Sequence, residues 1–135
     1  MLDYAFDKDF NLSILFLRVE GPSLSEINRK LIKRVKDKEI PEEERKKFLM
    51  KVLYQSTLAL YEMKKCGVIH RDIKPDNIML EICEDDWEKI NISSETPFEI
   101  VFIDFGCAKV SDLIKLNLSK AGNERYLCPD LFLED

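Results

Sequence analysis

The sequence has little of what metal sites and disulfide frameworks are built from. It contains one histidine, His70, and four cysteines that stand far apart, with no Cys-x-x-Cys pair among them. Structural zinc sites and disulfide-rich folds need such residues in clusters, so neither is indicated. Scattered cysteines are typical of reducing compartments, and we expect a cytoplasmic protein, with the nucleus as the alternative.

Long apolar runs and an excess of positive charge are also missing. The longest apolar run, residues 14–17, is far shorter than the roughly 20 residues of a membrane-spanning helix. Charged residues such as Asp3 and Lys8 interrupt any secretory signal. Lys and Arg number 21 against 26 Asp and Glu, a formal net charge of -5, which argues against binding to nucleic acid or to a membrane.

The remaining composition predicts one hydrophobic core. The chain has 135 residues, of which 45% are hydrophobic. A domain of this size buries about two thirds of the surface that its unfolded chain exposes. We therefore expect one domain over residues 1–135 and no second domain.

Local signals at the start of the chain predict a strand followed by a helix. Residues 12–19 are rich in β-branched and aliphatic side chains, and they indicate a buried strand that stops at the Gly21-Pro22 breaker. Ser23 and Glu26 form an S-x-x-E capping box, in which each side chain satisfies a free backbone N–H of the other residue. This box predicts a helix that ends near Lys36.

A second, longer helix is predicted from Pro41 to Cys66, closed by Gly67. Proline followed by three glutamates suits the first turn of a helix, where negative charge faces the positive end of the dipole. Apolar or small residues recur at spacings of three and four, and we expect all of them to face the core: Phe48, Leu49, Val52, Leu53, Ser56, Ala59, Leu60 and Met63.

Two short strands are predicted after the second helix. Residues 70–77 form a polar loop, and apolar runs follow at residues 78–80 and 100–103. The connection between these runs, residues 81–99, is longer than most connections and is highly charged. We expect it to be a surface insertion.

Two polar motifs lie beside these strands. Residues 70–77 read His-Arg-Asp-Ile-Lys-Pro-Asp-Asn, and residues 104–106 read Asp-Phe-Gly. Together the motifs resemble the H-R-D-x-K-x-x-N catalytic loop and the D-F-G metal loop of eukaryotic-type protein kinases. The chemistry that this resemblance implies explains the residue types, because transfer of a γ-phosphoryl group needs a carboxylate that orients the attacking hydroxyl, and oxygen ligands that hold magnesium against the phosphates. Asp72 suits the first role.

This resemblance implies a serine/threonine protein kinase that transfers the γ-phosphate of ATP to protein hydroxyls, with Mg2+ as the metal. Asp72, Lys74 and Asn77 would be its catalytic residues. Lys74 would neutralise charge on the transferred phosphate, and a lysine there is typical of the serine/threonine type. Asn77 and Asp104 would hold the metal through oxygen atoms that suit a hard cation.

Four further residues are interpreted through the same resemblance. Phe105 and Gly106 would complete the cofactor-binding loop that Asp104 begins. Met79 would lie beneath the adenine ring, although a plain core position explains it equally well. In the family, the histidine at the position of His70 packs against Phe105, so a structural role is favoured over that of a catalytic base.

The C-terminal part resembles the end of a kinase activation segment. Residues 122–130 are similar to the pattern G-T-x-x-Y-x-A-P-E, with Asn123 in place of threonine, Cys128 in place of alanine and Asp130 in place of glutamate. In the family the threonine hydroxyl contacts the catalytic Asp and Lys. The departure at Asn123 therefore bears on how the substrate is positioned.

Activation-loop phosphorylation is a further expectation from the family. Arg71 resembles the arginine that pairs with a loop phosphate in many kinases. Ser111 and Ser119 are the serines available in the loop, and ordinary solvated positions explain them equally well.

The resemblance runs from the hinge to the end of the activation segment and implies an α+β fold. This would be a partial large lobe, mainly helical with short β strands. Residues 15–24 would hold the hinge strand and the segment that follows it, with Phe16 or Leu17 as the gatekeeper. The sequence contains no Gly-rich phosphate loop and no strand lysine of the V-A-I-K type. We therefore expect exposed apolar surface along the hinge strand, and a partner that covers the place of the small lobe.

Three functions remain open at this point. The chain is part of an active protein kinase, a truncated pseudokinase that acts as a binding module, or a small-molecule phosphotransferase of related fold. Intact Asp72 and Asp104 argue against a pseudokinase, and Lys74 and Gly106 argue against a small-molecule enzyme. Without the clamp on the α- and β-phosphates, activity of this chain alone is also open.

Overall fold

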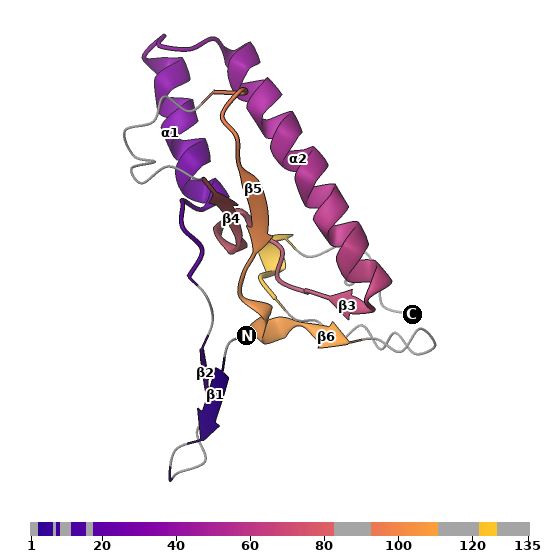
Figure 1. Cartoon of the computed structure of the whole chain (residues 1–135). Coiled ribbons are helices and arrows are strands. Elements are labelled where there is room, and N and C mark those ends of the chain that lie inside the picture. The colour runs from indigo at the N-terminus through magenta and orange to yellow at the C-terminus, as the bar shows by residue number, and fades with distance from the viewer. Residues whose placement is uncertain are drawn as a thin grey trace.

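Two antiparallel helices and three short strand pairs make up the described part of the computed structural model, which covers residues 3–6, 8, 12–15, 18–82, 93–110 and 122–126. The helices are α1 (Leu24–Lys36) and α2 (Glu42–Lys65), which contact each other (Figure 1). The strands are β1 (Asp3–Phe6), β2 (Leu12–Leu15), β3 (Val68–Ile69), β4 (Ile78–Glu81), β5 (Glu99–Phe102) and β6 (Lys109–Val110), and three 3-10 turns are η1 (Pro75–Asn77), η2 (Phe105–Cys107) and η3 (Glu124–Tyr126). The mainly helical α+β fold with short strands is confirmed.

Both helices begin where the sequence predicts. The Ser23 side chain accepts a hydrogen bond from the backbone N–H of Glu26 (3.2 Å), and the Glu26 carboxylate accepts one from the N–H of Ser23 (2.8 Å), so the capping box is formed. Pro41 precedes α2, and Gly67 follows its end with φ at 68°. Within the described residues, neither helix combines the length and apolarity that crossing a membrane requires.

The core lies between α1, the inner face of α2 and the β4–β5 pair. Its buried residues are Ile27, Leu31, Phe48, Val52, Leu80, Ile82 and Phe98. The expectation that all the apolar positions of α2 face this core is wrong for Leu53, which is 58% exposed, and for Leu60, which is 38% exposed. The buried stripe of α2 runs through Phe48, Val52 and Ser56, with Leu49 packed beside it, because each helical residue is rotated by about 100° from the one before it.

The connection expected as a surface insertion is held partly against α2. Residues 83–92 lie outside the described part, but Thr96 and Phe98 are buried. The Lys51 ammonium donates to the Thr96 carbonyl (2.9 Å), and the Gln55 amide donates to the Phe98 carbonyl (3.0 Å). The Phe98 ring lies 5.1 Å from that of Phe48. For Thr96 and Phe98 the surface expectation is wrong, because the Phe98 ring and these two donors hold the segment against α2.

Residues 20–22, just before α1, pair with the backbone of β4 and of Ile82, which follows it, and lie very close to it. Leu80 donates its N–H to the Pro22 carbonyl (2.9 Å), and Ile82 donates to the Glu20 carbonyl (3.3 Å). Gly21 lies between these acceptors with φ at 138°, and a Cβ there would stand 2.0 Å from the Leu80 carbonyl oxygen. Only glycine allows this contact.

A Gly21→Ala variant is therefore expected to lose about 3 kcal/mol or more of its free energy of unfolding, since the new methyl group must displace backbone at a strained φ. Urea unfolding measures this loss. A Lys47→Ala variant, changed at an exposed position of α2, serves as control and should unfold like the wild type. Equal stability of Gly21→Ala and wild type would contradict the close approach.

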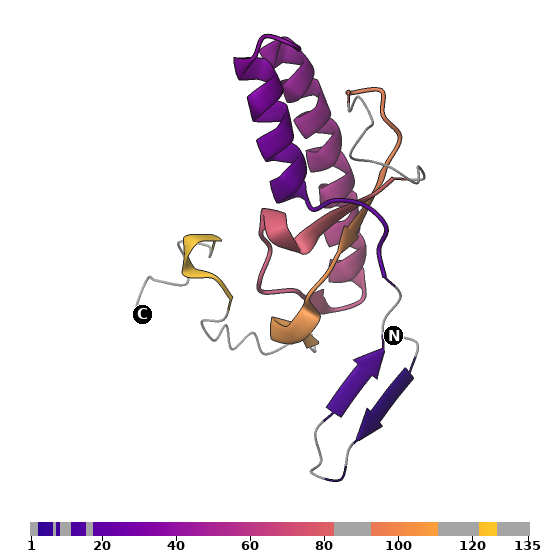
Figure 2. The same cartoon turned by 90° about the vertical axis from the view of Figure 1, so that its left-hand side faces the viewer.

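The N-terminal strand is shorter than predicted and belongs to a hairpin. β2 ends at Leu15 and pairs antiparallel with β1, which the sequence did not predict, in the register Asp3↔Leu15 to Phe6↔Leu12. Both views show this hairpin projecting away from the helices (Figures 1 and 2). The side chains of residues 12–17, including both gatekeeper positions, lie outside what the structure describes.

Candidate active site

Two strand pairs bring the polar motifs together. β4 pairs antiparallel with β5, with Ile78 opposite Phe102, and β3 pairs antiparallel with β6, with Ile69 opposite Lys109. The loop from β3 to β4 carries residues 70–77, and the loop from β5 to β6 carries residues 103–108. Ile103 donates its N–H to the Asn77 carbonyl (3.0 Å). The two loops therefore lie face to face.

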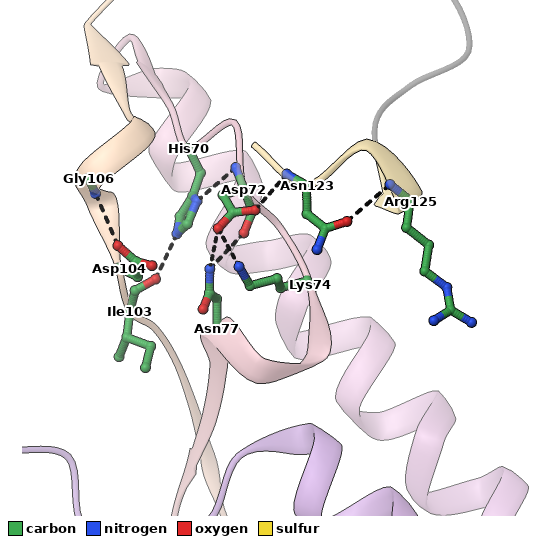
Figure 3. Close-up of polar contacts among 9 residues, drawn as sticks. All are labelled: His70, Asp72, Lys74, Asn77, Ile103, Asp104, Gly106, Asn123 and Arg125. Carbon is green, nitrogen blue, oxygen red and sulfur yellow. Dashed lines mark hydrogen bonds and ion pairs between the residues drawn. The ribbon is translucent and has the colours of Figure 1, made fainter. Parts of the chain in front are cut away.

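Asp72 is the centre of a hydrogen-bonded cluster (Figure 3). Its side chain is almost fully buried. Its Oδ2 accepts from the Lys74 ammonium (2.7 Å) and from the Asn77 amide (2.9 Å). Its Oδ1 accepts from the backbone N–H of Asn123 (3.0 Å). The structure thus brings together all three residues predicted to be catalytic.

Asp72 and Lys74 stabilise each other's charged forms. The hydrogen bond from Lys74 is the main reason that the pKa of Asp72 lies below its ordinary value, and it outweighs burial, which acts the other way. The same hydrogen bond from Lys74 to Asp72 is the main reason that the pKa of Lys74 lies above its ordinary value, and the charge of Asp104 adds to this effect. Asp72 is therefore a carboxylate and Lys74 an ammonium at neutral pH.

Asn77 and Asp104 present oxygen atoms from adjacent loops. The Asn77 amide nitrogen donates to the Asp72 side chain and to the Asp72 carbonyl (3.0 Å). These bonds orient the amide, so its oxygen is the atom that remains to bind a metal. Asp104 is exposed, and one of its oxygens accepts from the N–H of Gly106 (3.4 Å). In the described part of the chain no three His, Cys, Asp or Glu side chains group to hold a metal.

Both ring nitrogens of His70 are engaged, Nε2 with the other loop and Nδ1 within its own loop. Nε2 lies 3.0 Å from the Ile103 carbonyl, and Nδ1 accepts from the N–H of Asp72 (3.3 Å). This pair of contacts assigns the proton to Nε2. The ring also packs against Phe105, with centroids 4.6 Å apart. The predicted contact of His70 with Phe105 is present, and neither nitrogen is left to take a proton from a substrate.

Two non-glycine residues of these loops adopt left-handed backbone conformations. Arg71 has φ at 65° and Asp104 has φ at 62°. Such residues cost about 1 to 3 kcal/mol each and persist where the surroundings hold them. Arg71 is held by its Nε, which donates to the Cys107 carbonyl, and Asp104 by its contact with Gly106. The strain therefore falls on the two loops that carry the motifs.

Met79 faces away from the main core. It lies on β4 between the buried Ile78 and Leu80, and it is half-buried while they are buried. Successive strand residues point to opposite faces, so Met79 projects from the other side of β4. Met79 is therefore not a member of the core cluster.

The end of the predicted activation segment touches the catalytic loop. Gly122 has φ at 93°, and a Cβ on it would stand 1.9 Å from the Arg71 carbonyl oxygen. The contact of the Asn123 N–H with Asp72 was not predicted from the sequence, where only the missing hydroxyl was considered. The signal was the Gly-Asn pair itself, since glycine permits close backbone approach. Ser111, Ser119, Cys128 and Asp130 lie outside the described residues.

Comparison with known proteins agrees with the motifs. The protein kinase domain family matches residues 2–135. A probable serine/threonine-protein kinase of Dictyostelium discoideum is 34% identical over 133 residues, which are 98% of this chain and 9% of that protein. A serine/threonine-protein kinase of Caenorhabditis elegans is 35% identical over 93% of this chain and 11% of its own length. An Aurora kinase of Encephalitozoon cuniculi is 37% identical over 60% of this chain and 24% of its own length. The chain thus spans less than a quarter of each of these relatives.

Proposed function

Because the chain belongs to the protein kinase domain family, we propose that it supplies the catalytic and metal-binding loops of a serine/threonine protein kinase. The reaction transfers the γ-phosphoryl group of ATP to hydroxyl groups of a protein substrate, with Mg2+. The observation that carries this proposal is the cluster of Asp72, Lys74 and Asn77, with Asp104 close enough for its charge to raise the pKa of Lys74.

Asp72 and Lys74 have complementary parts in this reaction. Asp72, kept as a carboxylate by Lys74, orients the attacking hydroxyl and accepts its proton. Lys74, kept as an ammonium by Asp72, neutralises charge on the phosphoryl group as it is transferred. The bond of 2.7 Å between them fixes both side chains before any substrate arrives.

Asn77 and Asp104 are the metal ligands in this proposal. Mg2+ in such sites is bound by one or two protein side chains, with phosphate oxygens and water in the other positions. One amide oxygen and one exposed carboxylate fit that requirement, and the bound metal would neutralise charge on the phosphates. Phe105, packed on His70, and Gly106, bonded to Asp104, hold this carboxylate in place.

Met79 is the adenine contact in this proposal. Its position on the side of β4 away from the core supports this role over that of a plain core residue. We also propose a cytoplasmic location, and a partner that covers the place of the small lobe. Phe105 is 45% exposed in the described part of the chain, and this apolar surface is consistent with such a partner.

Phosphate transfer by the protein in its full length tests the function. With radiolabelled ATP we expect label on serine and threonine peptides and not on a peptide whose only hydroxyl is tyrosine. The transfer should stop when EDTA removes Mg2+. ATP binding without transfer to any peptide would instead support the pseudokinase, and transfer to a small hydroxylated metabolite alone would support the small-molecule enzyme.

A further inference from the structure

Asn123 meets the catalytic carboxylate through its backbone. Its N–H donates to Oδ1 of Asp72 at 3.0 Å, across 51 positions of sequence (Figure 3). Gly122 makes this approach possible, because any side chain there would collide with the Arg71 carbonyl. The contact therefore depends on the backbone conformation of Gly122 and Asn123.

The Asn123 side chain is turned toward its own segment. Its Oδ1 accepts from the backbone N–H of Arg125 (3.1 Å), and its carbonyl accepts from the N–H of Tyr126 (2.9 Å). An asparagine that caps the N–H two residues ahead stabilises a tight turn. The side chain thus fixes η3 and, through it, the direction of the Asn123 N–H.

The contact leaves Asp72 able to bind a substrate. A carboxylate oxygen has two lone pairs, and the Asn123 N–H uses one on Oδ1. Lys74 and Asn77 both bind Oδ2, so the three donors fix the carboxylate from its two ends. The second lone pair of Oδ1 is then the acceptor with the most freedom for an incoming hydroxyl.

We propose, on the basis of the kinase function above, that Asn123 is a positioning residue: by capping its own turn, its side chain aims a backbone N–H that holds Asp72 Oδ1 in place for the phosphoacceptor hydroxyl. A backbone donor thus takes over at a position where the family pattern has a threonine hydroxyl. The side chain at 123 acts through geometry and does not touch the substrate.

Three variants of the full-length protein test this role. Asn123→Ala removes the cap and should lower kcat for peptide phosphorylation by about 10-fold to 100-fold, with KM for ATP and the Tm close to wild type. Asn123→Ser can still cap the turn and should restore kcat to within about threefold of wild type. Glu124→Ala, an exposed neighbour in the same turn, is the control and should leave kcat unchanged. A wild-type kcat in Asn123→Ala, or no recovery in Asn123→Ser, would overturn the proposal.

Hydrogen exchange separates this proposal from the kinase function. Mass spectrometry of the peptide spanning residues 122–126 should show faster exchange in both Asn123→Ala and Asp72→Ala than in wild type, since Asp72→Ala removes the acceptor and Asn123→Ala removes the cap that aims the donor N–H. Unchanged exchange in both variants would overturn the contact itself. If the wild type transfers no phosphate while the exchange changes as expected, the proposed function fails and the contact stands.

Discussion

An Asp72→Asn variant is expected to transfer phosphate at least about 100-fold more slowly than the wild type. The substitution keeps the shape of the side chain and removes its charge. Asp72 accepts from three donors at its two oxygens, Lys74 and Asn77 at one and Asn123 at the other. An amide has one acceptor oxygen and one nitrogen that donates, so either orientation sets a donor against at least one of the three. The variant loses both the proton acceptor and the geometry around it.

Initial rates with a serine peptide at saturating Mg2+ and ATP measure this effect. Asp76→Asn is the matched control, because Asp76 is an exposed carboxylate in the same loop and its charge also acts on Lys74. We expect its rate to stay within about threefold of wild type, as exposed charge pairs contribute little. A rate for Asp72→Asn equal to that of Asp76→Asn would remove the assignment of Asp72 as the base.

Local sequence signals predicted the helices and the motif loops because each depends on residues close together in the chain. The capping box of Ser23 and Glu26 is complete within four residues, and it begins α1 as predicted. The spacing from Asp72 to Asn77 is fixed by one short turn, η1. The strands on either side of the insertion were also predicted, since β4 and β5 are apolar runs of ordinary length.

Apart from those that the family resemblance supplied, such as the packing of His70 on Phe105, features that depend on distant contacts were not predicted. Helical spacing predicts a face of α2 that is apolar, but it does not say how wide a stripe its neighbours cover, and Leu53 and Leu60 lie beyond that stripe. Phe98 was assigned to the surface because the residues before it are charged. Its burial depends on Phe48 and Gln55, which come more than forty residues earlier. The Asn123 contact with Asp72 is of the same kind.

An Asp104→Asn variant is expected to separate metal binding from folding. Asp104 holds φ at 62°, a conformation that asparagine tolerates better than most residues, and an asparagine oxygen can still accept from Gly106. The fold should therefore persist with an unchanged Tm. A neutral amide oxygen is a weaker ligand for Mg2+ than a carboxylate, so the Mg2+ concentration at half-maximal rate should rise by at least about 10-fold.

Titrating Mg2+ at fixed ATP in the phosphorylation assay distinguishes a lost ligand from a lost charge. Asp76→Asn removes a carboxylate that also acts on Lys74 but belongs to no metal site in our proposal, and its Mg2+ dependence should match that of the wild type. If Asp104→Asn lowers the rate equally at all Mg2+ concentrations, Asp104 acts on Lys74 and the phosphates through charge alone. Recovery of rate at high Mg2+ in Asp104→Asn and not in Asp72→Asn assigns the first carboxylate to the metal and the second to the hydroxyl, because only a binding defect is reversed by mass action.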